Sequence, residues 1–163
     1  VTNMKLTENT LLTNHNSPVI QKNNIVKNEN LEKLTNDIID KYDVRTPFQN
    51  PQASSLSGGN LQKFVVGREI IKKPRVLFVA QPTWGVDIGA TKFIRNALID
   101  LANDGCGIIV ISQDLEELFE LADNICVLFR GKLSDSKPLQ ELNSEKIGML
   151  MGGEDLYSES QGH

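Results

Sequence analysis

The sequence lacks the features of several large classes of protein. Its two cysteines, Cys106 and Cys126, form no CxxC pair, and its two histidines lie near opposite ends of the chain, so neither a zinc site nor a disulfide framework is indicated. This cysteine usage fits a reducing, cytosolic compartment. No apolar run approaches the length of a membrane span, and the first residues do not show the basic-then-apolar order of a signal peptide. Any membrane role is therefore expected to work through a partner.

Positive charge is also scarce. The 17 lysines and arginines are outnumbered by 21 aspartates and glutamates, which leaves a formal net charge of -4. Because non-specific binding of nucleic acids relies on lysine and arginine to neutralise phosphates, we expect no nucleic-acid partner. The 163 residues and their 39% hydrophobic content are enough for one globular domain with a core. The chain starts at Val1 rather than at a methionine, so we expect further residues upstream.

After an Asn-rich opening, the chain alternates between helix and strand patterns. Apolar spacing and turn residues predict a brief helix around Leu11 and Leu12, then a loop near Pro18, and a helix capped by Asn30. The expected helices from there on cover residues 30–42, 59–71, 87–104, 114–123 and 144–151, and the expected buried strands cover 75–80, 107–112 and 124–129. Strands separated by helices of this length imply an α/β fold with a parallel sheet covered on both faces.

The stretch ASSLSGGNLQKF, residues 53–64, places a serine and two glycines directly before a helix pattern. In one interpretation Ser57 only caps the helix and the glycines let the chain turn. The same geometry also suits a phosphate, because unpaired N–H groups and the positive end of the helix dipole face it and glycines allow close approach. Taken alone, this stretch leaves both interpretations open.

The order of the surrounding elements favours the phosphate. A glycine-rich helix start is followed by a strand ending in QPTWGVD and by another strand ending in ISQDLEE. In this compound pattern the chain resembles the ATP-binding subunit of ABC transporters, and most closely the C-terminal nucleotide-binding domain of the tandem ATPases that serve simple-sugar and nucleoside importers. Four segments carry the resemblance. LTENTLL is similar to the stretch after the family's Q-loop, and YDVRTP is similar to the lead-in to its signature. LSGGNLQK is similar to the signature itself, and IGMLMGGE is similar to the C-terminal end of the domain.

The resemblance implies a fold class and a division of the chain. The fold would be an incomplete P-loop NTPase domain of the ABC type, with a parallel sheet flanked by helices. Residues 1–52 would belong to the helical subdomain, and residues 53–163 to the C-terminal part of the ATPase core, with the Walker A half absent. No GxxxxGK[ST] occurs in the sequence, since Gly131 and Lys132 are adjacent but Cys126 and Leu133 occupy the other required positions. We expect the apolar surface that such a half would cover to cause self-association or to be covered by the N-terminal segment.

The resemblance also implies site residues. Carried over position by position, Ser57, Gly58, Gly59 and Asn60 form the signature, which in the family closes on the γ-phosphate of ATP held by the opposite domain. Asp87 would lie in the D-loop, which also reaches across the dimer.

Three positions depart from the family's catalytic pattern. A competent Walker B strand ends in Asp-Glu, whereas this sequence has Ala80 and Gln81 there. Ala80 offers no oxygen to Mg²⁺, and the Gln81 amide cannot accept a proton from water as a carboxylate can. The switch position, histidine in the family, is Gln113. The resemblance therefore predicts a degenerate site whose domain completes the ATP site of its partner.

The implied function is ATP-driven import of simple sugars or nucleosides, with nucleosides favoured by the Ala-Gln pair. The full-length protein would use ATP and Mg²⁺, while this part alone is expected to be inactive, without bound nucleotide and without a metal site. The expected partners are a second nucleotide-binding domain, transmembrane permease subunits and, indirectly, a solute-binding protein, at the cytoplasmic face of the membrane. Two alternatives stay open: a soluble tandem ABC protein of ribosomes or DNA repair, and a stand-alone regulatory module.

Overall fold

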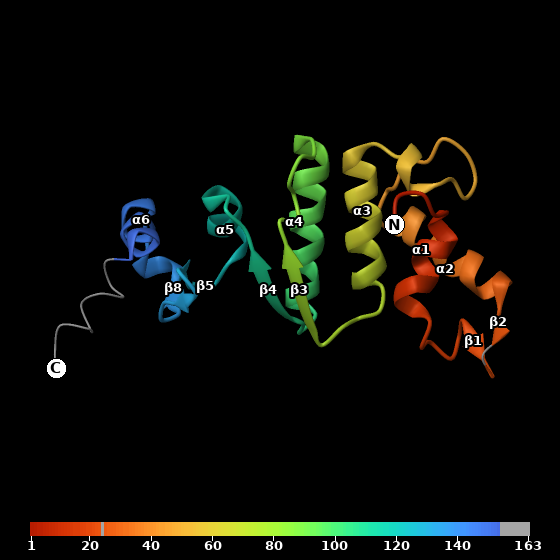
Figure 1. Cartoon of the computed structure of the whole chain (residues 1–163), viewed down its shortest axis with the longest axis horizontal. Helices are drawn as coiled ribbons and strands as arrows, with labels where there is room; N and C mark the ends of the chain where they lie inside the picture. The colour runs from red at the N-terminus through yellow and green to blue at the C-terminus, as the bar shows by residue number, and fades with distance from the viewer. Residues whose placement is uncertain (24, 154–163) are drawn as a thin grey trace. The chain divides into compact units, whose positions relative to one another are not determined.

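The computed structural model describes residues 1–23 and 25–153, and the chain divides into two compact units, residues 1–109 and residues 110–163 (Figure 1). Each unit has its own secondary structure and its own buried residues. The polar tail at residues 157–163 lies outside the described residues.

The first unit begins with two helices joined by a small hairpin. Helix α1 covers Leu6–Asn14 and helix α2 covers Asn28–Lys41, which confirms the two helices predicted for this part of the chain. Between them, strands β1 (Gln21–Lys22) and β2 (Ile25–Val26) pair antiparallel. The sequence gives no signal for this hairpin, because two-residue strands are too short for a period of two to be recognised.

The start of α2 differs from the prediction. The sequence predicts a cap at Asn30, but the helix begins two residues earlier and its cap position is Lys27, which makes no side-chain capping bond. Asn30 lies in the first turn instead, where its side-chain Nδ2 donates to the carbonyl of Val19 at 2.6 Å. Its amide therefore ties the preceding loop to α2.

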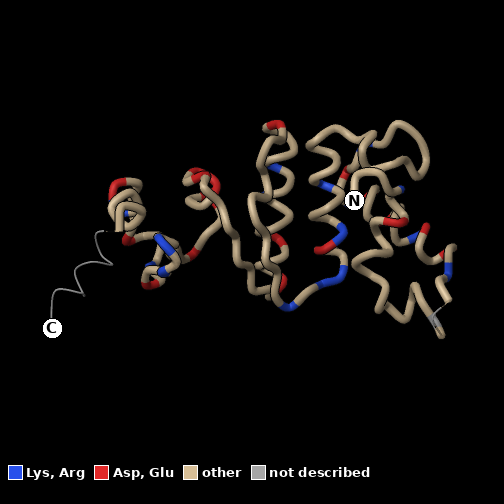
Figure 2. Tube along the Cα trace, viewed as in Figure 1, with Lys and Arg blue, Asp and Glu red and all other residues tan. Residues whose placement is uncertain are grey.

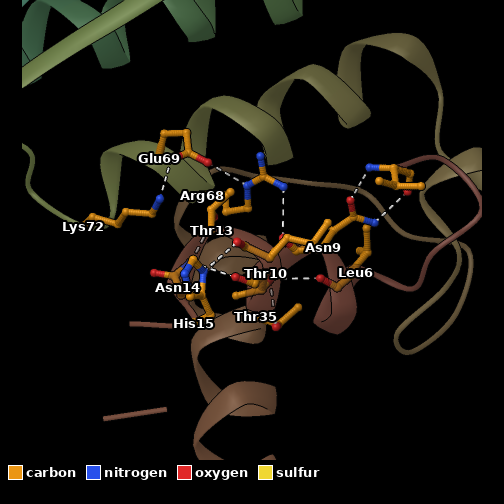
Figure 3. Close-up of polar contacts among 12 residues, drawn as sticks. Leu6, Asn9, Thr10, Thr13, Asn14, His15, Thr35, Arg68, Glu69 and Lys72 are labelled. Carbon is orange, nitrogen blue, oxygen red and sulfur yellow. Dashed lines mark hydrogen bonds and ion pairs between the residues drawn. The ribbon is translucent and has the colours of Figure 1, made fainter. Parts of the chain in front are cut away.

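A buried polar contact joins α1 to α2 (Figure 3). The hydroxyl oxygens of Thr10 and Thr35, both at most 1% exposed, lie 3.1 Å apart. Each hydroxyl also lies close to the carbonyl four residues earlier in its own helix, at 2.9 Å for Thr10 and 2.8 Å for Thr35. Because both hydroxyls keep a partner, their burial does not carry the cost of an unsatisfied polar group.

Helix α3, Gly58–Ile70, packs against both α2 and α4 (Ile88–Asn103). Its approach to α2 is close, because a Cβ atom at Gly67 would lie 2.5 Å from the ring of Tyr42. Burial raises the pKa of the Tyr42 phenol. The predicted helix and its Ser57 cap are confirmed, since the Ser57 hydroxyl accepts from the backbone N–H of Asn60.

The C-terminal half of α3 is tied to α1 by Arg68. Its Nη1 donates to the carbonyl of Asn9 at 3.0 Å, and its Nε lies 2.9 Å from Oε1 of Glu69 (Figure 3). Burial by itself raises the pKa of Glu69, but Lys72 and Arg68 outweigh it and hold that pKa below its usual value. Basic residues gather near the end of α3 (Figure 2), where the negative end of the helix dipole favours cations.

Two neighbouring strands follow α3 and are connected by α4. Strands β3 (Val76–Ala80) and β4 (Gly107–Ile111) form a two-stranded sheet, and their arrows point the same way in Figure 1. The predicted apolar face of α4 is confirmed, because its buried residues are Ala90, Ile94, Leu98 and Leu101. Gly105, with φ of +91°, provides the turn from α4 into β4.

The sequence predicts that these strands are covered on both faces, and this is wrong for the chain as it stands. Side chains alternate between partly buried and exposed along each strand, with Val76 56%, Phe78 68% and Ile109 47% exposed. A continuous apolar run is typical of a strand with helices on both sides. In the described residues one face of β3 and β4 is open, and the N-terminal segment does not cover it.

The third predicted strand, residues 124–129, does not join the β3–β4 sheet. It is divided into β5 (Asn124–Ile125) and β6 (Leu128–Phe129), which pair antiparallel with β8 (Lys137–Pro138) and β7 (Lys132–Leu133). The cause is local: Arg130 and Gly131 both have positive φ, which is the geometry of a two-residue hairpin turn, so β6 folds back on the residues that follow it.

Helices complete the second unit. Helix α5 covers Leu115–Leu121 and α6 covers Ser144–Gly152, which confirms the two helices predicted here. A short 3-10 turn, Leu139–Glu141, lies between β8 and α6. The apolar core of the unit consists of Ile125, Val127, Ile147 and Leu150.

We expect the chain of residues 1–163 alone to self-associate through the open face of β3 and β4. Covering apolar surface contributes about 25 cal/mol for each Å² removed from water, so replacing the exposed Phe78 by glutamine should weaken association. Sedimentation velocity over a range of concentrations would measure this, with Leu12→Gln on α1 as the matched control. A compact monomer at every concentration would contradict the expectation.

Candidate functional site

The predicted phosphate-binding segment lies where the chain enters α3. Ser57 and Gly58 are exposed, Gly59 is buried and Asn60 is partly buried. The N–H groups of Gly58 and Gly59 have no intrahelical acceptor, because the first turn of a helix lacks one. Together with the Ser57 hydroxyl, these groups form a donor set that fits an anionic phosphate.

Asn60 connects this segment to the loop before it. Its Nδ2 donates to the Ser57 Oγ at 2.8 Å, and its backbone N–H approaches the same oxygen at 3.4 Å. Its Oδ1 accepts a hydrogen bond from the backbone N–H of Arg45 at 2.9 Å. The side chain of Asn60 is therefore engaged with the protein on both of its polar atoms.

The start of α4 lies against the start of α3. Asp87 caps α4, with its Oδ1 accepting from the N–H of Ala90 at 2.9 Å. A Cβ atom at Gly59 would lie 2.7 Å from Oδ2 of Asp87 and 2.9 Å from Cβ of Ala90, whereas one at Gly58 would lie 3.5 Å from the carbonyl of Gly85. The structure thus brings the predicted D-loop residue, Asp87, close to one of the predicted signature glycines, Gly59.

Lys63, one turn further along α3, holds the loop that carries Arg45. Its Nζ donates to the backbone carbonyl of Asp43 at 3.0 Å and to its carboxylate at 2.8 Å. The ammonium group also lies 4.7 Å from the centre of the Phe93 ring on α4. The hydrogen bond from Lys63, and its charge, hold the pKa of the Asp43 carboxyl below its usual value.

The predicted Walker B positions lie at the end of β3. Ala80 is exposed and is the last residue of the strand. Gln81 has a φ of +49°, uncommon for a residue other than glycine, and its carbonyl accepts from the N–H of Trp84 at 3.2 Å. This end of the strand therefore forms a turn without a carboxylate at either predicted position, and its donor set does not fit Mg²⁺.

The predicted switch residue, Gln113, belongs to the second unit. It is exposed and lies between β4 and α5. Its neighbours form a local cap, in which the N–H of Asp114 donates to the Ser112 hydroxyl at 3.0 Å and Asp114 accepts from the first N–H groups of α5.

Sequence reasoning missed Asp43 and Arg45 as contributors to the signature region. The stretch YDVRTP was recognised only as a lead-in, and the contribution of Arg45 is its backbone N–H, which any residue except proline offers. The described residues hold no cluster of three or more histidine, cysteine or acidic side chains arranged for a metal ion. Within the same residues, no helix has both the length and the apolarity needed to cross a bilayer.

The chain is similar to several curated ATP-binding proteins. The guanosine import ATP-binding protein of Bacillus subtilis is 38% identical over 90% of this chain and 29% of its own length. The nucleoside import ATP-binding protein of Lactococcus lactis is 33% identical over 94% of this chain and 30% of its own length. The ribose import ATP-binding protein of Shouchella clausii is 34% identical over 96% of this chain and 31% of its own length. The chain therefore spans less than a third of these relatives, and no family model matches it.

Solved structures share the fold. A dimeric ATP-binding cassette in a post-hydrolysis state with ADP and phosphate has a TM-score of 0.68 at 22% identity, over 85% of this chain and 58% of that one. An ATP-binding cassette in its ADP conformation has a TM-score of 0.61 at 19% identity, over 99% of this chain and 64% of that one. These likenesses confirm the predicted fold class, a partial P-loop NTPase domain of the ABC type.

The two glycines of the predicted signature should respond differently to alanine. At Gly59 the added Cβ would overlap Asp87 and Ala90, and overpacking of this kind costs about 1–3 kcal/mol. At Gly58 the added Cβ makes an ordinary contact, and alanine favours a helix over glycine by up to about 1 kcal/mol. Urea unfolding of the two variants would measure the difference, and an equal loss of stability in Gly58→Ala would contradict the packing argument.

Proposed function

We propose that this chain, which is similar to ATP-binding proteins of nucleoside and sugar importers, donates the signature to an ATP site shared with a partner domain. The full-length protein would hydrolyse ATP to drive import. The observation that carries the proposal is the start of α3, where the exposed residues Ser57 and Gly58 offer a hydroxyl and a backbone N–H group to an anion.

The signature residues would bind the γ-phosphate of ATP held by the partner domain. When bound, ATP with Mg²⁺ supplies the phosphoryl group whose hydrolysis releases the free energy for transport. Ser57 would donate its hydroxyl hydrogen to a phosphate oxygen, and the backbone of Gly58 would allow close approach because it has no side chain. The contact between Gly59 and Asp87 supports a further role for Asp87, that of a D-loop residue next to the signature.

The domain's own ATP site would be degenerate. Ala80 and Gln81 lie at the end of β3 without a carboxylate for Mg²⁺ or for an attacking water, and Gln113 takes the place of the switch histidine. Residues 1–52 would form part of the helical subdomain and residues 53–163 the C-terminal part of the ATPase core. We propose that the partner domain belongs to the same polypeptide, because the relatives are more than three times as long as this chain.

The relatives' names support a proposal for the substrate class. Two of them import guanosine or nucleosides and one imports ribose, so we propose a nucleoside or simple-sugar importer and favour a nucleoside. Its partners would be transmembrane permease subunits and, through them, a solute-binding protein. The protein would work at the cytoplasmic face of the membrane.

The chain of residues 1–163 by itself should neither hydrolyse ATP nor bind Mg-ATP specifically at sub-millimolar concentration. It has only the signature side of a shared site, and a few donors at one helix start compete poorly with water for a phosphate chain. Isothermal titration calorimetry with Mg-ATP would test this, with Ser57→Asp as the control for weak anion binding. Tight, saturable binding by the unchanged chain would overturn the division of the site.

Replacing Ser57 by aspartate separates its two roles, because aspartate caps a helix about as well as serine but places a negative charge where the phosphate would bind. In the full-length protein assembled with its permease, Ser57→Asp should leave thermal stability within about 0.5 kcal/mol of the unchanged protein. ATP hydrolysis should fall by a factor on the order of 10², as for the loss of a donor that stabilises developing charge.

The matched control is Ser54→Asp, at an exposed position in the 3-10 turn before the signature. It should keep both stability and ATP hydrolysis. If Ser57→Asp hydrolyses ATP as fast as this control, Ser57 is only a helix cap and the proposal fails.

A further inference from the structure

The hydrogen bonds of Asn60 point to a role that differs from contact with nucleotide. Its Oδ1 is occupied by the N–H of Arg45 and its Nδ2 by the Ser57 Oγ. One N–H group and one oxygen lone pair of this amide are therefore already used within its own domain. This separates Asn60 from the other three predicted signature residues, to which the family resemblance assigns the same role.

The effect on Ser57 is specific. A hydroxyl oxygen has two lone pairs that accept and one hydrogen that donates. Asn60 approaches the Ser57 Oγ with two N–H groups, its side-chain Nδ2 at 2.8 Å and its backbone N at 3.4 Å. With both lone pairs facing donors, the remaining capacity of the hydroxyl is to donate, and the hydrogen is left to point away from Asn60.

The orientation of the Asn60 amide is itself fixed by the protein. The N–H of Arg45 can only donate, so the atom that faces it must be Oδ1, and Nδ2 must then face Ser57. The loop that carries Arg45 is held in turn by the two hydrogen bonds from Lys63 to Asp43 and by the bond from the N–H of Val44 to the carbonyl of Ile39, 2.9 Å long, at the end of α2.

We propose that Asn60 is a positioning residue, which holds the Ser57 hydroxyl as a hydrogen-bond donor to an anionic oxygen and ties that hydroxyl to the loop at the end of α2. This inference rests on the proposed function, because it assumes that Ser57 donates to a phosphate. It extends that function by stating how a movement at the end of α2 reaches the signature: through the N–H of Arg45, the amide of Asn60 and the hydroxyl of Ser57.

The test is a double-mutant cycle on the full-length protein assembled with its permease. Asn60→Ala removes the side-chain amide without adding bulk, and should lower the rate of ATP hydrolysis at saturating ATP about tenfold, within the range of couplings between contacting residues. In a Ser57→Ala background the same change should have no further effect, because no hydroxyl is left to orient. Asn96→Ala, at an exposed amide on α4, is the control.

A second measurement needs no nucleotide. Hydrogen exchange should show faster exchange of the Arg45 amide in Asn60→Ala, because that N–H loses its acceptor, and unchanged exchange in Ser57→Ala. Asn60→Asp keeps an acceptor for Arg45 and should therefore keep the protection of that amide, while its second oxygen takes the hydrogen of Ser57 and hydrolysis falls.

The outcomes separate the inference from the function on which it rests. Additive losses in the double variant, or unchanged hydrolysis or unchanged Arg45 exchange in Asn60→Ala, would overturn the positioning role and leave the proposed function standing. Unchanged hydrolysis in Ser57→Ala would overturn both.

Discussion

The close approach of α3 to its neighbours is the constraint on which the first unit depends. At two points the helix has no room for a side chain: a Cβ atom at Gly59 would lie 2.7 Å from the Asp87 carboxylate, and one at Gly67 would lie 2.5 Å from the Tyr42 ring. Glycine inside a helix costs roughly 0.5–1 kcal/mol relative to alanine. The tight packing on α4 and on the end of α2 offsets that cost, and it fixes where the start of α3 lies.

This packing holds the middle and the end of α3 in place and leaves its first residues exposed to solvent. Phe64 in the middle of the helix is buried, and Arg68 near its end is bonded to the α1 backbone. Ser57 and Gly58, in contrast, are open to solvent. The helix is held by its packing on the neighbouring helices, while its first residues are exposed to solvent. Such a site loses little conformational entropy when a ligand binds, which is how preorganised sites gain affinity.

Part of the fold and of the candidate site could be predicted from local sequence signals. The Ser57 and Asp87 caps and the apolar face of α4 depend on a few neighbouring residues, and the sequence shows them directly. The contact between Asn60 and Arg45 could not be found in this way, because it is made by a backbone N–H whose position depends on the fold. The strand predicted over residues 124–129 failed for a related reason: its apolar composition suits a parallel strand, but the turn after it decides the pairing.

Packing also differs between the predicted Walker B positions and the predicted signature. Ala80 is exposed at the end of a strand, and Gln81 lies partly buried in the turn that follows. Substitutions there change chemistry without removing core contacts, and their cost in stability is small. Gly59 is different, because it is buried and an added Cβ atom would overlap Asp87 and Ala90. Under the proposed division of the ATP site, a side chain at Gly59 would therefore disturb the packing of α3 on α4 as well as the signature.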